Sequence, residues 1–196
     1  PNQCKMNKLK LFLLILFSQF LNSQSIIGAW EKYETNSDGS THRHVVIFSK
    51  GCKSTRVIDS SNGKFISTNG GSWFLDGSTL TEKIEFDTQD QEIVGSTIKF
   101  ELDINENTFT NIKSGKTWKR IDDGTPGQLN GAWLMSGRFR NGVKSTRSID
   151  RPRKTMKILS GSRFQWIAFN TETRQFMGTG GGTYLTVNGK YIEQIE

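Results

Sequence analysis

Two glutamates stand at equivalent places in two similar stretches of the sequence and are the first candidates for chemistry. Glu82 lies in Leu80-Thr-Glu-Lys-Ile84, and Glu193 lies in Tyr191-Ile-Glu-Gln-Ile195. Strand alternation puts each glutamate on the same face as its flanking apolar residues. An inward carboxylate is costly unless it is paired. Each glutamate is therefore either a group that orients a ligand's hydroxyl or amine, or a structural partner of a buried arginine or tyrosine.

Catalysis has weaker support. Glu85 and Glu196 fall on the opposite strand face, so neither stretch presents two carboxylates to one bond. There is no Gly-x-Ser-x-Gly motif, and His42-Arg-His44 is a histidine pair without a third ligand at metal-binding spacing. The sequence therefore predicts no catalytic residue, no metal ligand and no cofactor, and an activity based on Glu82 or Glu193 is a minor alternative.

Aromatic residues form the second group of candidates. Trp73 and Tyr184 are equivalent in the two stretches, and Trp166 and Phe176 add aromatic surface to the second. Such side chains either line an apolar or sugar-binding pocket or fill the interior of a small barrel. The candidate ligand-binding residues are Trp73, Glu82, Trp166, Phe176, Tyr184 and Glu193.

The two stretches belong to a longer repeat. Residues 65–85 recur without a gap as residues 176–196, with seven identities in 21 pairs, and Gly28-Ala-Trp30 recurs as Gly131-Ala-Trp133. The offset changes from 103 to 111 between these anchors, which predicts an insertion of roughly eight residues around residues 147–154. The sequence therefore predicts a duplication whose second copy lacks its C-terminal strands.

Short strands must position these residues. After the N-terminal segment, β-branched and aromatic runs alternate with clusters of Gly, Asn, Asp and Ser, and no helical apolar stripe appears. The first copy is predicted to contain eight strands: Ile26–Tyr33, His42–Phe48, Lys53–Asp59, Lys64–Phe74, Thr79–Phe86, Ser96–Ile104, Thr108–Ile112 and Lys116–Ile121. The second is predicted to contain five: Gly131–Phe139, Thr155–Ser160, Arg163–Asn170, Gln175–Thr186 and Lys190–Glu196.

The predicted fold class is all-β. Eight strands joined in sequence favour an up-and-down antiparallel β-barrel, which has no open edge, and a β-sandwich is the alternative. Five strands leave edges open, so the second copy should be marginal, prone to edge pairing, or held only by its neighbour. The predicted parts are residues 1–23 (upstream residues and signal peptide), 24–122 (first barrel), 123–129 (linker) and 130–196 (partial second barrel).

The N-terminus indicates export. A positive segment, residues 6–10, precedes an apolar run at residues 11–17 and small residues near position 23, the pattern of a secretory signal peptide. The apolar run is shorter than the ~20 residues that a spanning helix needs. The sequence predicts an exported protein without a transmembrane segment after signal cleavage.

Positive charge is concentrated in the second copy. Residues 138–174 hold ten Arg or Lys against Asp150 and Glu172. This surface is either a site for an anionic envelope polymer or a solvated insertion. Aromatic residues are not interleaved with the charges, so a nucleic-acid partner is not predicted.

Two motifs resemble known families. Gly28-Ala29-Trp30 resembles the Gly-x-Trp opening of lipocalin and calycin barrels, and Gly131-Ala132-Trp133 repeats it. In that superfamily the tryptophan closes one end of the barrel beneath an arginine of the last strand, which implies Arg120 here. The residues implied in barrel closure are Gly28, Trp30, Arg120, Gly131 and Trp133.

A second resemblance covers nearly the whole chain after residue 23. The segment Phe176–Tyr184 and the Glu-x-Ile-Glu that follows it are similar to tandem lipocalin-like domains of unknown function in secreted bacterial proteins. The first copy departs from the pattern at Ser67 and Asn69, where the second has glycines. The resemblance implies an exported binding module for a small apolar or amphipathic molecule. The alternative is a structural or adaptor protein that binds an anionic envelope partner.

Overall fold

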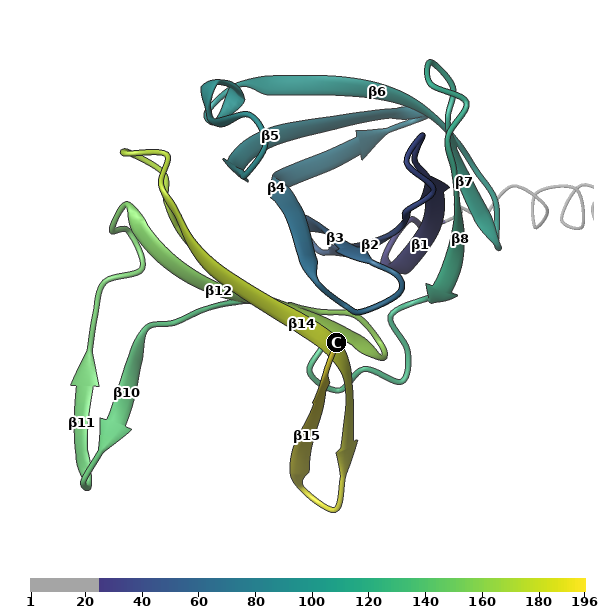
Figure 1. Ribbon diagram of the computed structural model, residues 1–196. Helices are drawn as coiled ribbons and strands as arrows, with labels where there is room; N and C mark the ends of the chain where they lie inside the picture. The colour runs from purple at the N-terminus through teal and green to yellow at the C-terminus, as the bar shows by residue number, and fades with distance from the viewer. Residues whose placement is uncertain (1–24) are drawn as a thin grey trace, which may run out of the picture.

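The first half of the chain forms a closed antiparallel barrel. The computed structural model describes residues 25–196, so the predicted signal peptide lies outside the described residues. Each barrel strand pairs with the next, and the last pairs with the first (Figure 1). This confirms the predicted all-β class and the up-and-down barrel, and a sandwich is excluded for these strands. The strands are β1 (Gly28–Thr35), β2 (Thr41–Ser49), β3 (Cys52–Asp59), β4 (Phe65–Asp76), β5 (Thr79–Asp87), β6 (Thr97–Ile104), β7 (Thr108–Asn111) and β8 (Thr117–Asp122).

The barrel closes where β8 meets β1. Trp30 lies opposite Arg120 in this ladder, next to a register shift between Ala29 and Trp30. Gly28 has a φ of 122°, and a Cβ there would lie 2.1 Å from the carbonyl oxygen of Asp122. Only glycine permits this approach of the two backbones. Inside this end of the barrel, Trp30 packs with Ile26, Phe48 and other apolar residues.

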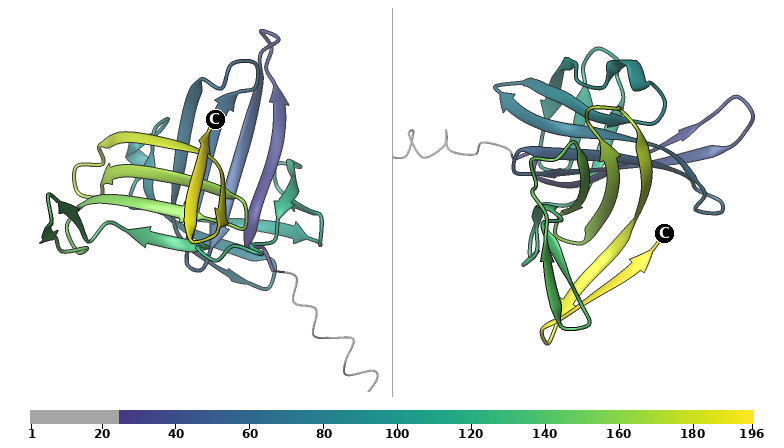
Figure 2. Two further views of the ribbon diagram at one scale, coloured as in Figure 1. Left: turned by 90° about the horizontal axis from the view of Figure 1, so that it is seen from below. Right: turned by 90° about the vertical axis from the view of Figure 1, so that its left-hand side faces the viewer.

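The second half forms an open sheet of five strands. Its order is β15-β14-β13-β12-β9, from β9 (Gly131–Leu134), β12 (Arg153–Leu159), β13 (Arg163–Asn170), β14 (Phe176–Val187) and β15 (Lys190–Ile195). Figure 2 shows this sheet packed on one side of the barrel. Strands β9 and β15 are its two edges.

The ladders of the sheet match those of the barrel residue for residue. Trp73 pairs with Glu82 in the barrel, and Tyr184 pairs with Glu193 in the sheet, at an offset of 111 residues. The β3–β4 ladder shifts register after Val57, and the β13–β14 ladder shifts at the equivalent residue, Ala168. The order β9-β12-β13-β14-β15 therefore parallels β1-β2-β3-β4-β5 in both pairing and irregularity.

One predicted strand, Gly131–Phe139, is wrong. β9 ends at Leu134, and the chain then forms a separate hairpin of β10 (Gly137–Arg140) and β11 (Val143–Thr146). Asn141 and Gly142 both have positive φ, 51° and 76°, which is the geometry of a tight two-residue hairpin turn. The residues between Thr146 and β12 separate this hairpin from the five-stranded sheet. A short 3-10 helix, η1 (Gln91–Ile93), was also not predicted.

The two parts pack through outward-facing side chains. Ala29, Ile47 and Phe86 of the barrel are buried in one cluster with residues of the sheet, namely Met156, Ile158, Ile167 and Phe169. At its margin Phe65 stacks on Phe176, with ring centroids 5.9 Å apart. The sheet thus covers the outside of the barrel, and its concave face points away.

Asp122 joins the two parts by hydrogen bonds. Its carboxylate accepts from the backbone N–H of Ala29 in β1 and from the N–H of Gly124 in the connection. It also accepts from Ser160, Gly161 and Ser162 in the β12–β13 turn, including both hydroxyls. The last residue of the barrel is therefore also an anchor for the sheet.

Candidate functional site

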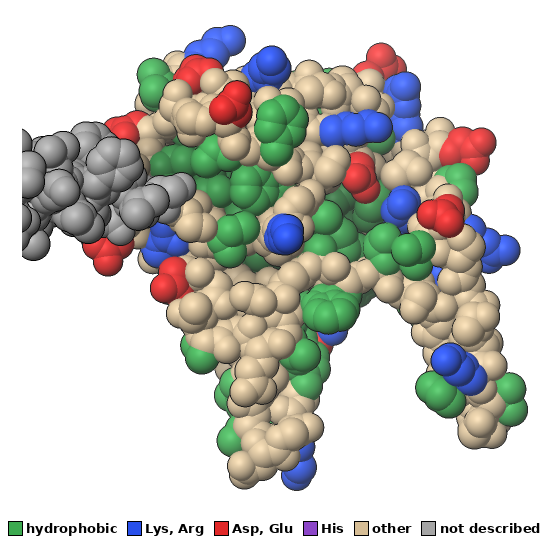
Figure 3. All heavy atoms as spheres, turned by 180° about the vertical axis from the view of Figure 1, so that it is seen from behind, with side chains coloured by type: hydrophobic (Ala, Val, Ile, Leu, Met, Phe, Trp, Pro, Cys, Tyr) green, Lys and Arg blue, Asp and Glu red, His purple; other side chains and the backbone are tan. Residues whose placement is uncertain are grey.

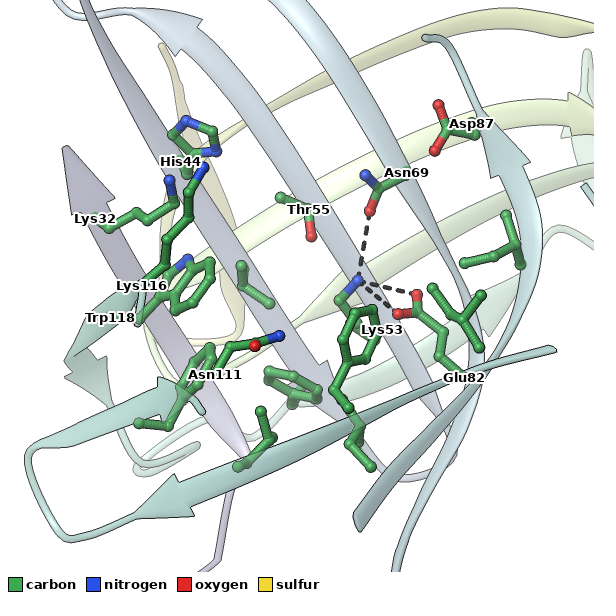
Figure 4. Close-up of a pocket in the computed structure, with 18 of the residues that line it drawn as sticks. Lys32, His44, Lys53, Thr55, Asn69, Glu82, Asp87, Asn111, Lys116 and Trp118 are labelled. Carbon is green, nitrogen blue, oxygen red and sulfur yellow. Dashed lines mark hydrogen bonds and ion pairs between the residues drawn. The ribbon is translucent and has the colours of Figure 1, made fainter. Parts of the chain in front are cut away.

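The interior of the barrel contains a cavity of about 330 Å³. Its apolar wall comes from β2, β5, β6 and β7, and includes Phe48, Leu80, Phe100, Leu102 and Phe109. Figure 4 shows polar side chains from several strands pointing into the same space. A mostly apolar cavity with a few convergent polar groups is typical of small-ligand sites.

One polar element of the cavity is a buried ion pair. Lys53 of β3 donates to both carboxylate oxygens of Glu82 on β5, at 2.9 Å each, and lies 3.4 Å from the Asn69 side-chain oxygen (Figure 4). The Glu82 side chain is almost fully buried. The inward orientation agrees with the strand alternation, but the partner is a lysine and not the expected arginine or tyrosine.

A second polar group consists of Lys32, Glu34 and Lys116, and it lies at the end of the barrel away from Trp30. Lys116 donates to Glu34 at 2.8 Å, and Lys32 also pairs with Glu34. These two hydrogen bonds lower the pKa of Glu34 to about 2. The Lys32 ammonium lies 5.3 Å from the centroid of the Trp118 ring. Two cations therefore share one carboxylate, and this end of the cavity keeps one positive charge in excess.

His44 stands beside these lysines. Burial, together with the charge of Lys32, lowers its pKa from 6.5 to about 4, although Glu34 lies 3.5 Å away. The imidazole is therefore neutral at neutral pH. Within residues 25–196 the other imidazole, His42, lies against Asn36 at 3.2 Å. No group of three His, Cys, Asp or Glu side chains with metal-binding geometry occurs in that part of the chain.

Trp30 fills the opposite end of the barrel interior, where it packs with Phe48 and Phe109. The Arg120 guanidinium carbon lies 3.8 Å from the centroid of its ring, and Arg120 also donates to the carbonyls of Ser25 and Ile27. The indole N–H of Trp30 donates to Ile26 at 2.9 Å. In the open sheet the indole N–H of Trp133 makes the equivalent bond to Leu129, also at 2.9 Å, but the Trp133 ring is exposed.

Of the six candidate ligand-binding residues, only Glu82 lines the barrel cavity. Trp73 packs edge-on against Phe48 and donates to the Ser49 carbonyl. Tyr184 is buried and makes the equivalent bond to Ser160. Phe176 lies in the contact between barrel and sheet.

The remaining two candidates belong to the open sheet. Glu193 pairs with Lys157, and Lys157 also lies over the rings of Phe164 and Tyr191. Burial opposes ionisation of Glu193, but hydrogen bonds from Lys157 and Tyr191 outweigh it and lower the pKa. Trp166 lies across the glycines of β14, close to Gly180. These residues form a second cluster, separate from the barrel cavity.

Several cavity residues were missed, although strand alternation contains the signal. Lys32 lies two residues from Trp30, and Trp118 lies two residues from Arg120, so each shares a strand face with a predicted closing residue. Lys53 likewise shares the face of Val57 on β3. The structure places both Lys32 and Lys53 against the cavity inside the barrel.

The positive surface divides into two parts. Lys157 and Arg163 pair with Glu193 and Glu196. The cations of the β10–β11 hairpin and the loop after it form no salt bridge within the described part of the chain. Residues 25–196 contain no helix with the length and apolar character needed to cross a bilayer.

Comparisons with protein-family models, with curated proteins and with solved structures found no match to this chain.

Proposed function

We propose that the chain is an exported, non-catalytic binding protein whose lipocalin-like barrel holds one small amphipathic molecule. The observation that carries this proposal is the cavity of about 330 Å³ inside a closed barrel. Its volume is at the lower end of the range for ligand pockets, ~300–1,000 Å³. Export is proposed from the signal-like pattern at the N-terminus, outside the described residues.

The lining defines the chemistry of the ligand. Phe48, Phe100 and Phe109 offer an apolar wall. Lys32 and Lys116 carry one positive charge in excess over Glu34, and the Trp118 indole N–H has no acceptor within residues 25–196. A buried donor without a partner is uncommon in folded proteins. The ligand we propose therefore has an apolar body and an anionic or strongly accepting group that meets these donors.

The Lys53–Glu82 pair sits on the wall of the cavity, where it orients the ligand. Because both Glu82 oxygens already accept from Lys53, the carboxylate is held as an ion-pair partner. This arrangement supports a binding role for Glu82 over a role as a general base. A ligand hydroxyl near Asn69 would complete the hydrogen bonding of this group.

We also propose that the open sheet is a second copy of the first five strands of the barrel. The matched ladders support this proposal, as do two pairs of equivalent hydrogen bonds, Trp30 to Ile26 with Trp133 to Leu129, and Trp73 to Ser49 with Tyr184 to Ser160. The Lys157–Glu193 pair then corresponds to Lys53–Glu82. Lys157 comes from β12, which corresponds to β2, whereas Lys53 comes from β3.

The test is binding of 8-anilinonaphthalene-1-sulfonate, an apolar probe with one anionic group. We expect saturable fluorescence enhancement at one site. Ile98 of β6 lines the cavity, and Ile98→Trp, which fills the cavity, should lose this site. Ile66→Trp adds the same side chain at an exposed position of β4 and is the matched control. Lys32→Gln with Lys116→Gln should weaken binding at least about tenfold, because charge-assisted hydrogen bonds contribute ~1.5–3 kcal/mol.

Native mass spectrometry of the protein from its own host then identifies the natural ligand. A removable adduct of small mass that is absent from Ile98→Trp supports the proposal. If the probe binds equally to the wild type and to Ile98→Trp and no adduct is found, the cavity is not a binding site. The structural or adaptor role would then be favoured.

A further inference from the structure

The β10–β11 hairpin, residues 137–146, projects from the rest of the protein as an isolated arm. It forms a two-stranded sheet of its own, and nearly all of its residues are exposed. Figure 1 shows the arm directed away from the barrel, and Figure 3 shows it from behind as a free extension. Side chains on both faces of this hairpin are exposed to solvent. A lone hairpin of this kind buries too little surface to contribute much stability.

The composition of this arm is one-sided. Arg138, Arg140 and Lys144 lie on it, and Arg147, Arg151 and Arg153 lie at its base. The arm has no acidic residue, and Asp150 is the one acidic residue at the base. None of these six cations forms a salt bridge within residues 25–196. The arm is therefore strongly and locally cationic.

Large apolar side chains share the end of the arm with these cations. Phe139 is 74% exposed and Val143 is 68% exposed, and they stand on either side of the Asn141-Gly142 turn. Figure 3 shows hydrophobic and cationic side chains together at this end. Cross-strand pairing places Phe139 opposite Lys144 and Arg140 opposite Val143, so each face of the hairpin carries both kinds of side chain.

We propose that this arm docks the protein on an anionic lipid surface. Cations would approach the headgroups, and Phe139 and Val143 would enter the boundary with the acyl chains. A soluble anionic polymer would satisfy the charges but would leave both apolar side chains in water, so the lipid surface fits better. This role goes beyond ligand binding in the barrel and uses none of the cavity residues.

The experiment is co-sedimentation of the full chain with vesicles made of equal parts phosphatidylcholine and phosphatidylglycerol. We expect binding that weakens with added salt and is absent with phosphatidylcholine alone. Each cation near such a surface changes partitioning by roughly fivefold. Charge reversal of Arg138, Arg140 and Lys144 to glutamate should therefore reduce binding more than about a hundredfold.

The matched control makes the same change in net charge elsewhere. Lys50→Glu, Lys64→Glu and Lys113→Glu alter three exposed lysines of the barrel. They should leave vesicle binding within about fivefold of the wild type, the effect of one cation. Phe139→Ser with Val143→Ser should remove the part of the binding that persists at high salt. All of these positions are solvent-exposed, so circular dichroism should be unchanged.

Three outcomes would overturn the proposal. The first is no binding to the anionic vesicles. The second is equal loss in the arm variant and the barrel control, which would show a general charge effect. The third is binding to soluble dextran sulfate without binding to vesicles, which would assign the arm to a polymer.

Discussion

The barrel and the open sheet have the same ladders but differ in what those ladders bury. Trp30, Leu80 and Ile84 are 0%, 3% and 2% exposed inside the barrel, whereas the equivalent Trp133, Tyr191 and Ile195 are 56%, 37% and 62% exposed. Where the five strands of the sheet correspond to β1–β5 of the barrel, pairing order and register are the same. The same face of the sheet buries only a small cluster of Leu159, Phe164 and Tyr184. The difference shows that a strand pattern alone does not create a full barrel core, which depends on the strands that close the barrel.

The face of the sheet that packs on the barrel is buried. Ile158 and Ile167 point away from the concave face and are fully buried, because they pack on the outside of the barrel. The sheet is therefore held by its neighbour, as its open edges suggested. The two parts should accordingly respond differently to substitutions at equivalent positions.

The largest difference is expected at the paired tryptophans. Trp30→Ala should lower the free energy of unfolding of the barrel by about 4 kcal/mol, because it leaves a cavity in the core and removes the partner of Arg120. Trp133→Ala should cost less than about 1 kcal/mol, because its ring is already solvated. Urea denaturation followed by circular dichroism measures both. Equal losses would show that the two indoles are in similar environments in solution.

The paired glutamates should show the next largest difference. Glu82→Ala leaves the Lys53 ammonium unpaired in a buried site and should cost about 3 kcal/mol. Glu193→Ala removes a partly exposed pair with Lys157 and should cost about 0.5 kcal/mol.

A double variant separates pairing from packing at Glu82. Lys53→Met with Glu82→Leu removes both charges and should recover most of the lost stability, because neither charge is then left buried alone. Urea denaturation of the single and double variants gives the coupling. If the double variant is as unstable as Glu82→Ala, the ion pair is not the source of the loss.

Between pH 6.5 and 4.5 the pH dependence of stability should come from the barrel, through His44. His44 binds a proton in the unfolded chain below pH 6.5 but in the folded protein only below about 4. The free energy of unfolding should therefore fall as the pH drops from 6.5 to 4. The full pKa difference amounts to about 3 kcal/mol, and the remaining solvent contact of the ring reduces this to about 2 kcal/mol.

His44→Asn checks this expectation. The variant should remove the pH dependence of the free energy of unfolding between pH 6.5 and 4. It should keep the dependence between pH 4.5 and 2, where protonation of Glu34 removes its pairing with the lysines. The equivalent residue in the sheet, Thr155, does not titrate. Urea titrations across this pH range supply the data. An unchanged slope in the variant would assign the effect to another group.

The smallest expected difference between the two parts concerns Arg120, which lies over the ring of Trp30. Arg120→Met removes the cation above the ring and the hydrogen bonds to Ser25 and Ile27, and should cost about 1 kcal/mol. Hydrogen exchange at the β1–β8 ladder should increase, and exchange in β13 and β14 should not. Equal acceleration in both parts would show that closure of the barrel also stabilises the sheet.

The barrel was predictable because its sequence obeys local rules. Alternation in β2 and β5 and turns such as Asp76-Gly77 define strands and their links, and eight strands in series favour closure. The β10–β11 hairpin was missed because Gly131–Phe139 was interpreted as one continuous strand. The Asn141-Gly142 turn was the available signal.

The candidate site was predictable only in part. Glu82 was predicted because leucine and isoleucine lie two residues away on either side. Lys53 has no such pair of apolar neighbours, and its contact with Glu82 depends on how β3, β4 and β5 are arranged. The placement of Phe176 against Phe65 depends on how the two parts pack. No local pattern encodes that contact.

The position of Asp122 has a consequence for the order of assembly. A chain that emerges with its N-terminus first completes the barrel when residue 122 joins β1. Only then are both carboxylate oxygens in place for the β12–β13 turn, to which Ser160 and Ser162 donate. If folding proceeds from the N-terminus, we therefore expect the second sheet to dock on Asp122 after the first barrel has closed.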